Sequence, residues 1–309
     1  MRFNGLMMTG EAMTGAVGPL KDRMRQAASW FLTGSLLAQG LRLGSSLVLT
    51  RLLMPEAFGL MAAVNTLYFG LLMFSDLGIW QSVVRSPRGR DQRFLGTAWL
   101  VQVMRGGLLA TLVLVLALLV QGGAAWGWFA PDTVYSDPRL PAMIALFAVA
   151  AVVQGLESVR LATAQRDLQG RRIVQLELLT QLVTIAITVV AAWLSGSVWA
   201  LLIGTLSATA TKTVLSYFLV PGAWVRPCWD GDSAREIVGF GKWVFVSSII
   251  GFLAAHGEKL LLGATLGVAA FGVFTIASNL LAALIGVYST LNGKVVFPSL
   301  SQVASNDDP

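Results

Sequence analysis

One stretch of about thirty residues occurs twice in this chain, and this repeat constrains the fold more than any other feature. Residues 30–59 align with residues 243–272 without a gap, and nine positions are identical. The shared positions include an opening tryptophan (Trp30 and Trp243), a serine and a closing Phe-Gly pair. Self-similarity at a fixed offset is typical of a duplicated structural unit. A common bias toward leucine is the alternative, but it does not explain matched Trp, Ser and Phe-Gly in one register.

The composition places this repeat in a membrane. Of all residues 55% are hydrophobic and only 12% are charged, and the mean hydropathy of +0.71 is too high for a soluble domain of 309 residues. Eight apolar segments reach the roughly 20 residues that one bilayer crossing needs. We expect these spans at about 30–53, 58–80, 98–120, 140–162, 173–194, 198–220, 240–266 and 271–296. The sequence therefore predicts an all-α polytopic membrane protein.

The spans group into one complete lobe and the opening of a second. We expect a cytoplasmic tail over residues 1–27, a six-helix lobe over 28–222, a cytoplasmic linker over 223–238 and the first two helices of a truncated second lobe over 239–309. Arginines concentrate in the loops after the second and fourth spans, which indicates that the amino terminus is inside. Because six spans precede the linker, the lobes are expected to be parallel repeats related by an axis along the membrane normal.

The composition also limits the chemistry. The single cysteine, Cys228, excludes a disulfide framework, and the single histidine, His256, excludes a multi-histidine metal centre. We expect no metal and no cofactor. The net charge of +6 could suit a nucleic-acid partner, but in a membrane protein the distribution of Lys and Arg among loops matters more than their sum, and we expect none. The outer loops leave no room for a catalytic domain, so we predict no catalytic residue and no enzyme.

A polar stripe runs along the first span, with Arg42 near its centre. Ser35, Gln39, Arg42 and Ser46 are spaced four, three and four residues apart, so they share one face of a helix. Arg42 lies roughly 16–18 Å of helix from either end of the span, where a charge costs on the order of 3 kcal/mol. The stripe is therefore expected to face a protein interior or a watery cavity. The alternative is a structural arginine paired with a neighbouring carboxylate.

Other spans carry polar faces that we expect to line the same cavity. Ser and Thr on such faces can also be simple helix-packing contacts, and Glu157 and Glu177 could instead pair with Arg42, Arg160 or Lys212. Beyond the first span, the candidate cavity residues are Asn65, Asp76, Glu157, Glu177, Lys212, Glu258 and Lys259.

The second copy of the repeat brings charge to a similar depth. Glu258 and Lys259 align with Ser45 and Ser46 of the first copy. Charge on the first helix of each lobe is what a substrate path between two lobes requires, although these two adjacent residues could also neutralise each other. We expect the nearby His256 to be structural rather than a proton relay.

Several short motifs together resemble one family of membrane transporters. In the first lobe they are R-L-L-M-P-E-A-F-G-L from Arg51, F-S-D-L-G from Phe74 and F-L-G-T-A-W-L-V-Q from Phe94, followed by Arg105 and Gly106. In the second lobe they are E-K-L-L-L-G from Glu258, F-G-V-F from Phe271 and V-F-P-S-L-S from Val296. Within the first motif, Pro55 is placed to open the second helix. These motifs resemble the bacterial polysaccharide exporters and oligosaccharide-lipid flippases of the MOP superfamily, the O-antigen and exopolysaccharide exporter branch.

The resemblance implies two six-helix bundles around an alternating-access cavity. Such a protein moves an undecaprenyl-pyrophosphate-linked oligosaccharide from the inner to the outer leaflet of the cell inner membrane. The implied partners are this lipid-linked substrate, the phospholipid bilayer, and the glycosyltransferases and polymerase of a polysaccharide pathway. A pyrophosphate headgroup needs cationic partners in a low-dielectric cavity. Arg42 is the best candidate for this contact, followed by Lys259 and Lys212.

The same resemblance leaves other functions open. Family members usually have twelve or more spans, so eight spans imply that four helices of the second lobe are missing, and a nonfunctional fragment is one alternative. A cation-coupled multidrug exporter of the same superfamily is another, and Asp76, Glu157 and Glu177 would then form its acidic cavity. A membrane glycan polymerase or ligase is not expected, because such enzymes display catalytic residues in sizeable outer loops.

Overall fold

The computed structural model describes residues 8–75, 78–167, 169–222 and 224–291. Apart from one isolated bridge between Thr133 and Gly267, the secondary structure of these residues is helical, which confirms the all-α fold. The helices in chain order are α1 (Met8–Leu52), α2 (Pro55–Phe74), α3 (Ile79–Arg85), α4 (Gln92–Ala125), η1 (Val134–Ser136), α5 (Leu140–Gly155), α6 (Arg160–Arg166), α7 (Gly170–Ser195), α8 (Trp199–Phe218), α9 (Gly231–Thr265) and α10 (Val268–Leu291).

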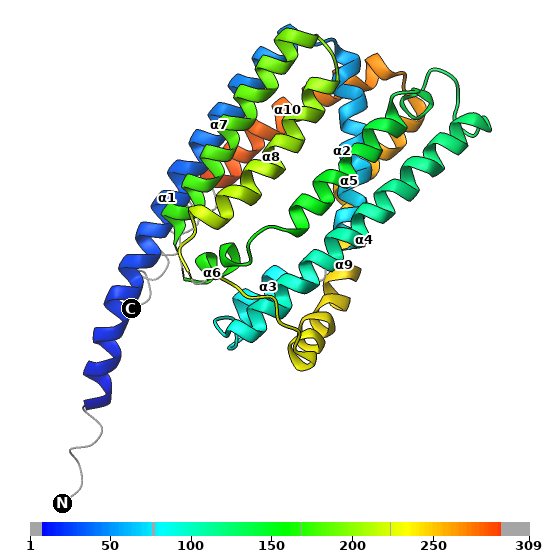
Figure 1. The fold of residues 1–309 in the computed structure, drawn as a ribbon. Coiled ribbons are helices and arrows are strands. Elements are labelled where there is room, and N and C mark those ends of the chain that lie inside the picture. The colour runs from blue at the N-terminus through cyan, green and yellow to red at the C-terminus, as the bar shows by residue number, and fades with distance from the viewer. Residues whose placement is uncertain (1–7, 76–77, 168, 223, 292–309) are drawn as a thin grey trace, which may run out of the picture.

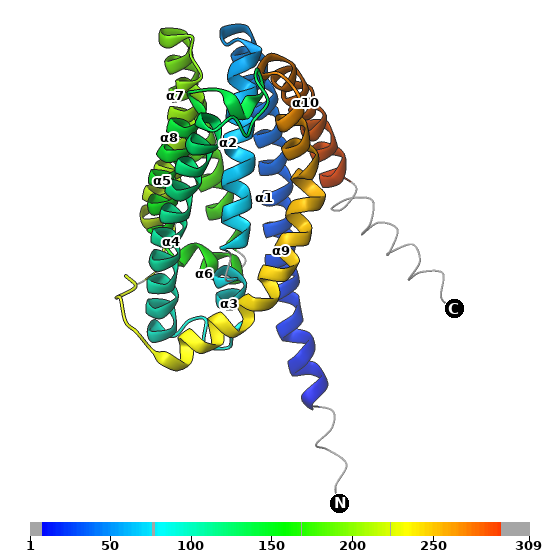
Figure 2. The same ribbon diagram turned by 90° about the vertical axis from the view of Figure 1, so that its right-hand side faces the viewer.

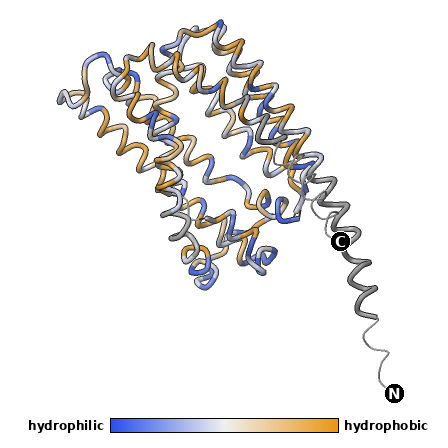
Figure 3. Tube along the Cα trace, turned by 180° about the vertical axis from the view of Figure 1, so that it is seen from behind, coloured by the Kyte–Doolittle hydropathy of each residue, from blue (hydrophilic) through white to orange (hydrophobic). Residues whose placement is uncertain are grey.

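The long helices form an elongated bundle of two groups (Figure 1). Helix α1 packs on α7 and α10, and α7 packs on α8, whereas α4 packs on α5 and α2 packs on α9. The groups meet where α2 contacts α10 and where α5 contacts α8. Figure 2 shows α9 running obliquely from the end that carries α3 toward the end where α10 begins. Figure 3 shows hydrophobic residues along the bundle and hydrophilic stretches gathered in the loops and short helices at its ends.

Several of these helices are suited to a membrane. By length and composition, α2, α4 and α7 can each cross a bilayer, and α5 with α6 makes a fourth candidate if this bent pair is one span. Helices occupy all eight segments that the sequence marked as spans. Helix α8, which carries Lys212 and several threonines, is not among these candidates. The total of eight crossings therefore stays a prediction.

Two of the predicted spans are broken rather than continuous. The helix expected over 58–80 ends at Phe74, and Gly78 adopts a left-handed backbone (φ 60°) before α3 begins. The helix expected over 140–162 ends at Gly155 and resumes in α6 with a bend of 60°. Pro55 does open α2, as predicted. Helix α9 begins at Gly231, inside the segment predicted as a linker.

The largest core cluster joins the two copies of the repeat. Leu60 of α2, Leu109 of α4 and Phe147 of α5 are almost fully buried in it. The closing phenylalanines of the two copies, Phe58 and Phe271, are buried in the same cluster. In a membrane such side chains stabilise helix contacts by van der Waals packing. The two copies are therefore held together by a shared core.

The two copies touch through a reciprocal backbone contact. Helices α2 and α10 begin at equivalent positions of the repeat, Pro55 and Val268. A Cβ atom added to Gly59 would lie 2.5 Å from the carbonyl oxygen of Val268, and one added to Gly272 would overlap the carbonyl oxygen of Pro55. The glycine of each copy thus faces the first helical residue of the other copy. This is the pattern that a two-fold axis imposes on a contact.

We expect Gly272→Ala to lower the free energy of unfolding by about 1–3 kcal/mol. The added methyl group meets the backbone of Pro55, which cannot rotate away as a side chain can. The matched control is Gly257→Ala in α9, where an added Cβ meets open space. Melting followed by tryptophan fluorescence in detergent checks both variants. Equal melting temperatures for the two variants would contradict the close contact.

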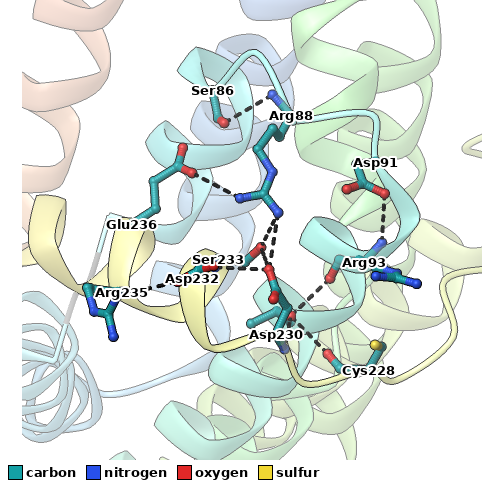
Figure 4. Close-up of polar contacts among 11 residues, drawn as sticks. Ser86, Arg88, Asp91, Arg93, Cys228, Asp230, Asp232, Ser233, Arg235 and Glu236 are labelled. Carbon is teal, nitrogen blue, oxygen red and sulfur yellow. Dashed lines mark hydrogen bonds and ion pairs between the residues drawn. The ribbon is translucent and has the colours of Figure 1, made fainter.

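A polar cluster fastens the start of α9 to the first lobe (Figure 4). Nη2 of Arg88, in the loop between α3 and α4, donates to Asp230 Oδ2 at 3.1 Å and to Ser233 Oγ at 3.0 Å. Nη1 of Arg88 lies 3.8 Å from the Glu236 carboxylate. The backbone amide of Asp230 donates to Thr97 Oγ1 of α4 at 3.0 Å. These contacts fix where α9 leaves the linker.

The stability that this cluster contributes is expected to depend on pH. Hydrogen bonds from Ser233, together with the guanidinium of Arg88, hold the pKa of Asp230 below its usual value of 3.8. A carboxyl with a lowered pKa stabilises the fold above its ordinary pKa and loses this effect as the pH falls through the folded-state pKa. Asp230→Asn should therefore lower the melting temperature at pH 7, and this difference should disappear as the pH falls through the lowered pKa of Asp230.

The control for this measurement is Asp232→Asn, because Asp232 is 80% exposed and pairs only with the equally exposed Arg235 within the described residues. Its melting temperature is expected to match that of the parent at every pH. An Asp230→Asn effect of the same size at pH 3 and pH 7 would show that the ionised carboxylate is not what stabilises the cluster.

Candidate functional site

A cavity of about 470 Å³ lies between helices of the two repeat copies. Helices α1 and α2 line it from the first copy, α9 and α10 from the second, and α7 and α8 complete its wall. Five of its lining pairs are separated by the same 213 residues that relate the copies: Leu43 and His256, Ser46 and Lys259, Ala62 and Thr275, Thr66 and Asn279, Phe69 and Ala282. The duplicated unit therefore builds the cavity from equivalent positions.

The charges at this cavity are positive. Arg42 projects from α1 and Lys259 from α9, and no Asp or Glu is among the described residues that line it. Arg42 is exposed, and within the described part of the chain no carboxylate forms an ion pair with it. The structural alternative for Arg42, a neighbouring carboxylate, is thus not what the described residues show. A cavity with this lining can hold an anion.

His256 lies at the edge of the same cavity between two aromatic rings. Its ring is 6.0 Å from that of Phe69 and nearly parallel to it, and 5.4 Å from that of Phe252. Its Nδ1 is buried without a hydrogen-bond partner among the described residues. Its contacts are thus mainly aromatic packing.

Two further cavities continue from the first along the inside of the first lobe. One of about 490 Å³ shares Arg42 with it and reaches Glu177, Gln181 and Lys212 on α7 and α8. The other, of about 220 Å³, is lined by Arg105 of α4 and by Glu157 at the break between α5 and α6. Lys212 lines both of these cavities. Arg42, Lys212 and Arg105 therefore line these cavities from the repeat interface into the first lobe.

The predicted site residues divide among these spaces. The first cavity is lined by Arg42, Ser46, Asn65 and Lys259, the second by Arg42, Glu177 and Lys212, and the third by Glu157 and Lys212.

Two described residues that the sequence predicted for the site, Gln39 and Glu258, do not line these cavities. Gln39 packs against Gly286 of α10, and its side-chain oxygen is buried without a hydrogen-bond partner among the described residues. Glu258 is exposed and lies outside the three cavity walls. Asp76 lies outside the described residues. Within those residues no cluster of His, Cys, Asp and Glu could hold a metal ion.

Glu157 forms an ion pair with Lys212, which is one of the three partners considered for it from the sequence. Nζ of Lys212 lies 3.0 Å from Oε1 of Glu157 and donates to Oε2 at 3.4 Å. The carboxylate is not on a continuous helical face with Gln154, because α5 ends at Gly155. The break therefore directs Glu157 toward α8.

Arg160 is a buried charge whose partners the sequence did not indicate. Its side chain donates to the carbonyl oxygens of Tyr217 and Gly222, each at 3.0 Å, and of Val220 at 3.4 Å. The guanidinium also lies 5.4 Å from the ring centre of Trp224. It caps the carbonyl end of α8 instead of pairing with a glutamate, which is favourable because that end carries partial negative charge. Spacing along one helix cannot show acceptors that belong to another helix.

We expect Arg160→Lys to lower the free energy of unfolding by about 2–3 kcal/mol, because one ammonium group cannot reach three separated carbonyls and leaves buried acceptors unpaired. The control is Arg90→Lys, whose side chain is 73% exposed and pairs with Asp167 at the surface. Thermal melting in detergent compares the two. A parent-like melting temperature for Arg160→Lys would show that the fork of hydrogen bonds contributes little.

Comparison with known proteins adds a family to this geometry. Residues 48–309 match the family model described as polysaccharide biosynthesis protein. An uncharacterized membrane protein in the cps region of Klebsiella pneumoniae is 20% identical over 292 residues, which cover 94% of this chain and 58% of that protein. The lipopolysaccharide biosynthesis protein WzxC of Escherichia coli K12 is 23% identical over 294 residues, which cover 94% of this chain and 56% of WzxC. The chain thus spans less than two thirds of either relative, and no solved structure matches it.

Proposed function

The chain belongs to the polysaccharide biosynthesis protein family, and we propose that it moves a lipid-linked oligosaccharide with an anionic pyrophosphate headgroup across a bacterial inner membrane by alternating access. One observation carries the proposal: the cavity between the repeat copies presents Arg42 and Lys259 and no carboxylate among its described lining residues. The proposal includes a cytoplasmic amino terminus and, as partners, the glycosyltransferases and polymerase that make and use such a lipid. It does not include an enzymatic step.

Arg42 and Lys259 lie on different copies of the repeat, and this placement suits a cargo that is bound in one arrangement of the copies and released in another. Arg42 belongs to the first copy and Lys259 to the second. Phosphate groups form charge-assisted hydrogen bonds with both side-chain types, and these bonds are strong where water is limited. A movement of one copy against the other changes the separation of the cations. The affinity for a headgroup that bridges them then differs between the two conformations, which is what alternating access requires.

The cation-coupled multidrug exporter is less well supported by this lining. It would need an acidic, ion-binding cavity in one lobe, but the two first-lobe cavities place Arg42, Arg105 and Lys212 beside Glu157 and Glu177. Of the acids considered for that role, Glu157 is held by Lys212 in a separate cavity. The charges thus favour an anionic cargo over a cationic one.

We expect Arg42→Ala to weaken the binding of undecaprenyl pyrophosphate about tenfold or more, because it removes a charge-assisted contact of roughly 1.5–3 kcal/mol. Arg42→Lys should retain part of the affinity, because it keeps the charge and loses only the fork geometry. Binding is measured by titration of the purified chain in lipid nanodiscs. The control is Arg172→Ala, since Arg172 is exposed and lies outside the three cavity walls.

Unchanged affinity for Arg42→Ala at parent-like melting temperature would remove the headgroup role. Transport itself is checked in proteoliposomes, by the rate at which the headgroup of a fluorescent pyrophosphate lipid becomes accessible to a membrane-impermeant reagent. A rate equal to that of protein-free vesicles would favour the nonfunctional fragment.

A further inference from the structure

We propose that Lys212 is a second anion subsite, and that Glu157 is its internal counter-ion, which the headgroup of the cargo displaces. The inference rests on the proposed function and assigns a role to a pair that lies outside the cavity at the repeat interface. The ligand is of the same class, a pyrophosphate diester.

The pair is exposed on one side only. The side chain of Lys212 is 42% exposed, whereas that of Glu157 is 14% exposed. Lys212 lines both first-lobe cavities, and the larger of these also includes Arg42. The ammonium group can therefore be reached from the space that holds the first cation, while the carboxylate lies in the wall behind it.

The backbone around Glu157 is held by hydrogen bonds from two neighbouring helices. The side-chain amide of Gln102 on α4 donates to the carbonyl oxygen of Glu157 at 2.8 Å. The hydroxyl of Tyr217 on α8 donates to the carbonyl oxygen of Leu156 at 2.6 Å, and the backbone amide of Ser158 donates to Ser216 Oγ at 3.0 Å. Backbone groups released by the break between α5 and α6 are thus bound by two neighbouring helices. None of these bonds involves Lys212, so the backbone of Glu157 does not depend on the ion pair.

The arrangement suits an exchange of anions rather than a permanent ion pair. A carboxylate and a phosphate offer an ammonium group the same kind of charge-assisted acceptor. A lysine is a flexible point charge that can turn from one acceptor to another without matching a planar geometry. The other charged groups facing these two cavities from the described residues are Arg42, Arg105 and Glu177.

The order of binding follows from the partners of the two cations. No carboxylate pairs with Arg42 among the described residues, so Arg42 is free to take the headgroup first. Lys212 becomes available only when Glu157 is displaced. Glu157 therefore weakens anion binding in the parent protein, and its removal strengthens it.

The test is the affinity of Glu157→Gln for undecaprenyl pyrophosphate, titrated on the full chain in nanodiscs. We expect about threefold to tenfold tighter binding, because the amide keeps the shape and hydrogen bonds but no longer competes as a charge. Lys212→Met should bind about tenfold more weakly, and Lys212→Arg should retain most of the affinity. Inorganic pyrophosphate, titrated in parallel, shows whether the headgroup alone produces the effect or the lipid is required. Glu236→Gln, outside the cavities, is the matched control.

Unchanged or weaker binding by Glu157→Gln would overturn the inference, because a merely structural glutamate predicts no gain. If Glu157→Gln does not fold, Lys212→Met decides: weaker binding at a parent-like melting temperature supports the subsite, and unchanged binding removes it. Arg42→Ala separates the two proposals. When Arg42→Ala weakens binding and the Glu157 and Lys212 variants do not change it, only the second subsite fails. When Arg42→Ala also leaves binding unchanged, the proposed function fails with it.

Discussion

The reciprocal backbone contact between Gly59 and Gly272 sets the geometry on which the interface cavity depends. Helices can approach at backbone distance only where neither carries a side chain, and here the two glycines occupy equivalent positions of the repeat. The contact therefore fixes the register of α2 against α10. Seven residues farther along each helix, two turns on, Thr66 and Asn279 both line the cavity. The close packing of the two glycines thus determines which side chains of α2 and α10 face the cavity two turns farther along.

Features that depend on local pattern could be predicted from the sequence. The repeat was visible as an ungapped match, the helices as apolar segments of spanning length, and the start of α2 as Pro55. Arg42 and Ser46 of the polar stripe on α1 both line the interface cavity, and the stripe could be read from spacing along one segment alone. Gln39 lies on the same stripe but packs against Gly286 of α10, because the stripe extends along α1 beyond the cavity.

Features that depend on a second helix could not be predicted. The break after Gly155 is stabilised by Gln102 and Tyr217, which lie far away in the chain. Hydropathy does not reveal this break, because α5 and α6 taken together still pass as one span. Arg160 is buried for a similar reason, since its acceptors are carbonyl groups at the end of α8. Backbone acceptors have no signature in the side-chain sequence.

Duplication preserved the backbone of the two copies but not their charges. Arg42 corresponds to Ala255 in the second copy, and Lys259 corresponds to Ser46 in the first. The two cations are therefore offset by four residues, about 6 Å along a helix axis, within a frame that is otherwise nearly symmetric. A strictly symmetric pair would place both cations at one level. The offset places Arg42 and Lys259 at two different levels of the cavity, so the duplicated frame carries an asymmetric charge.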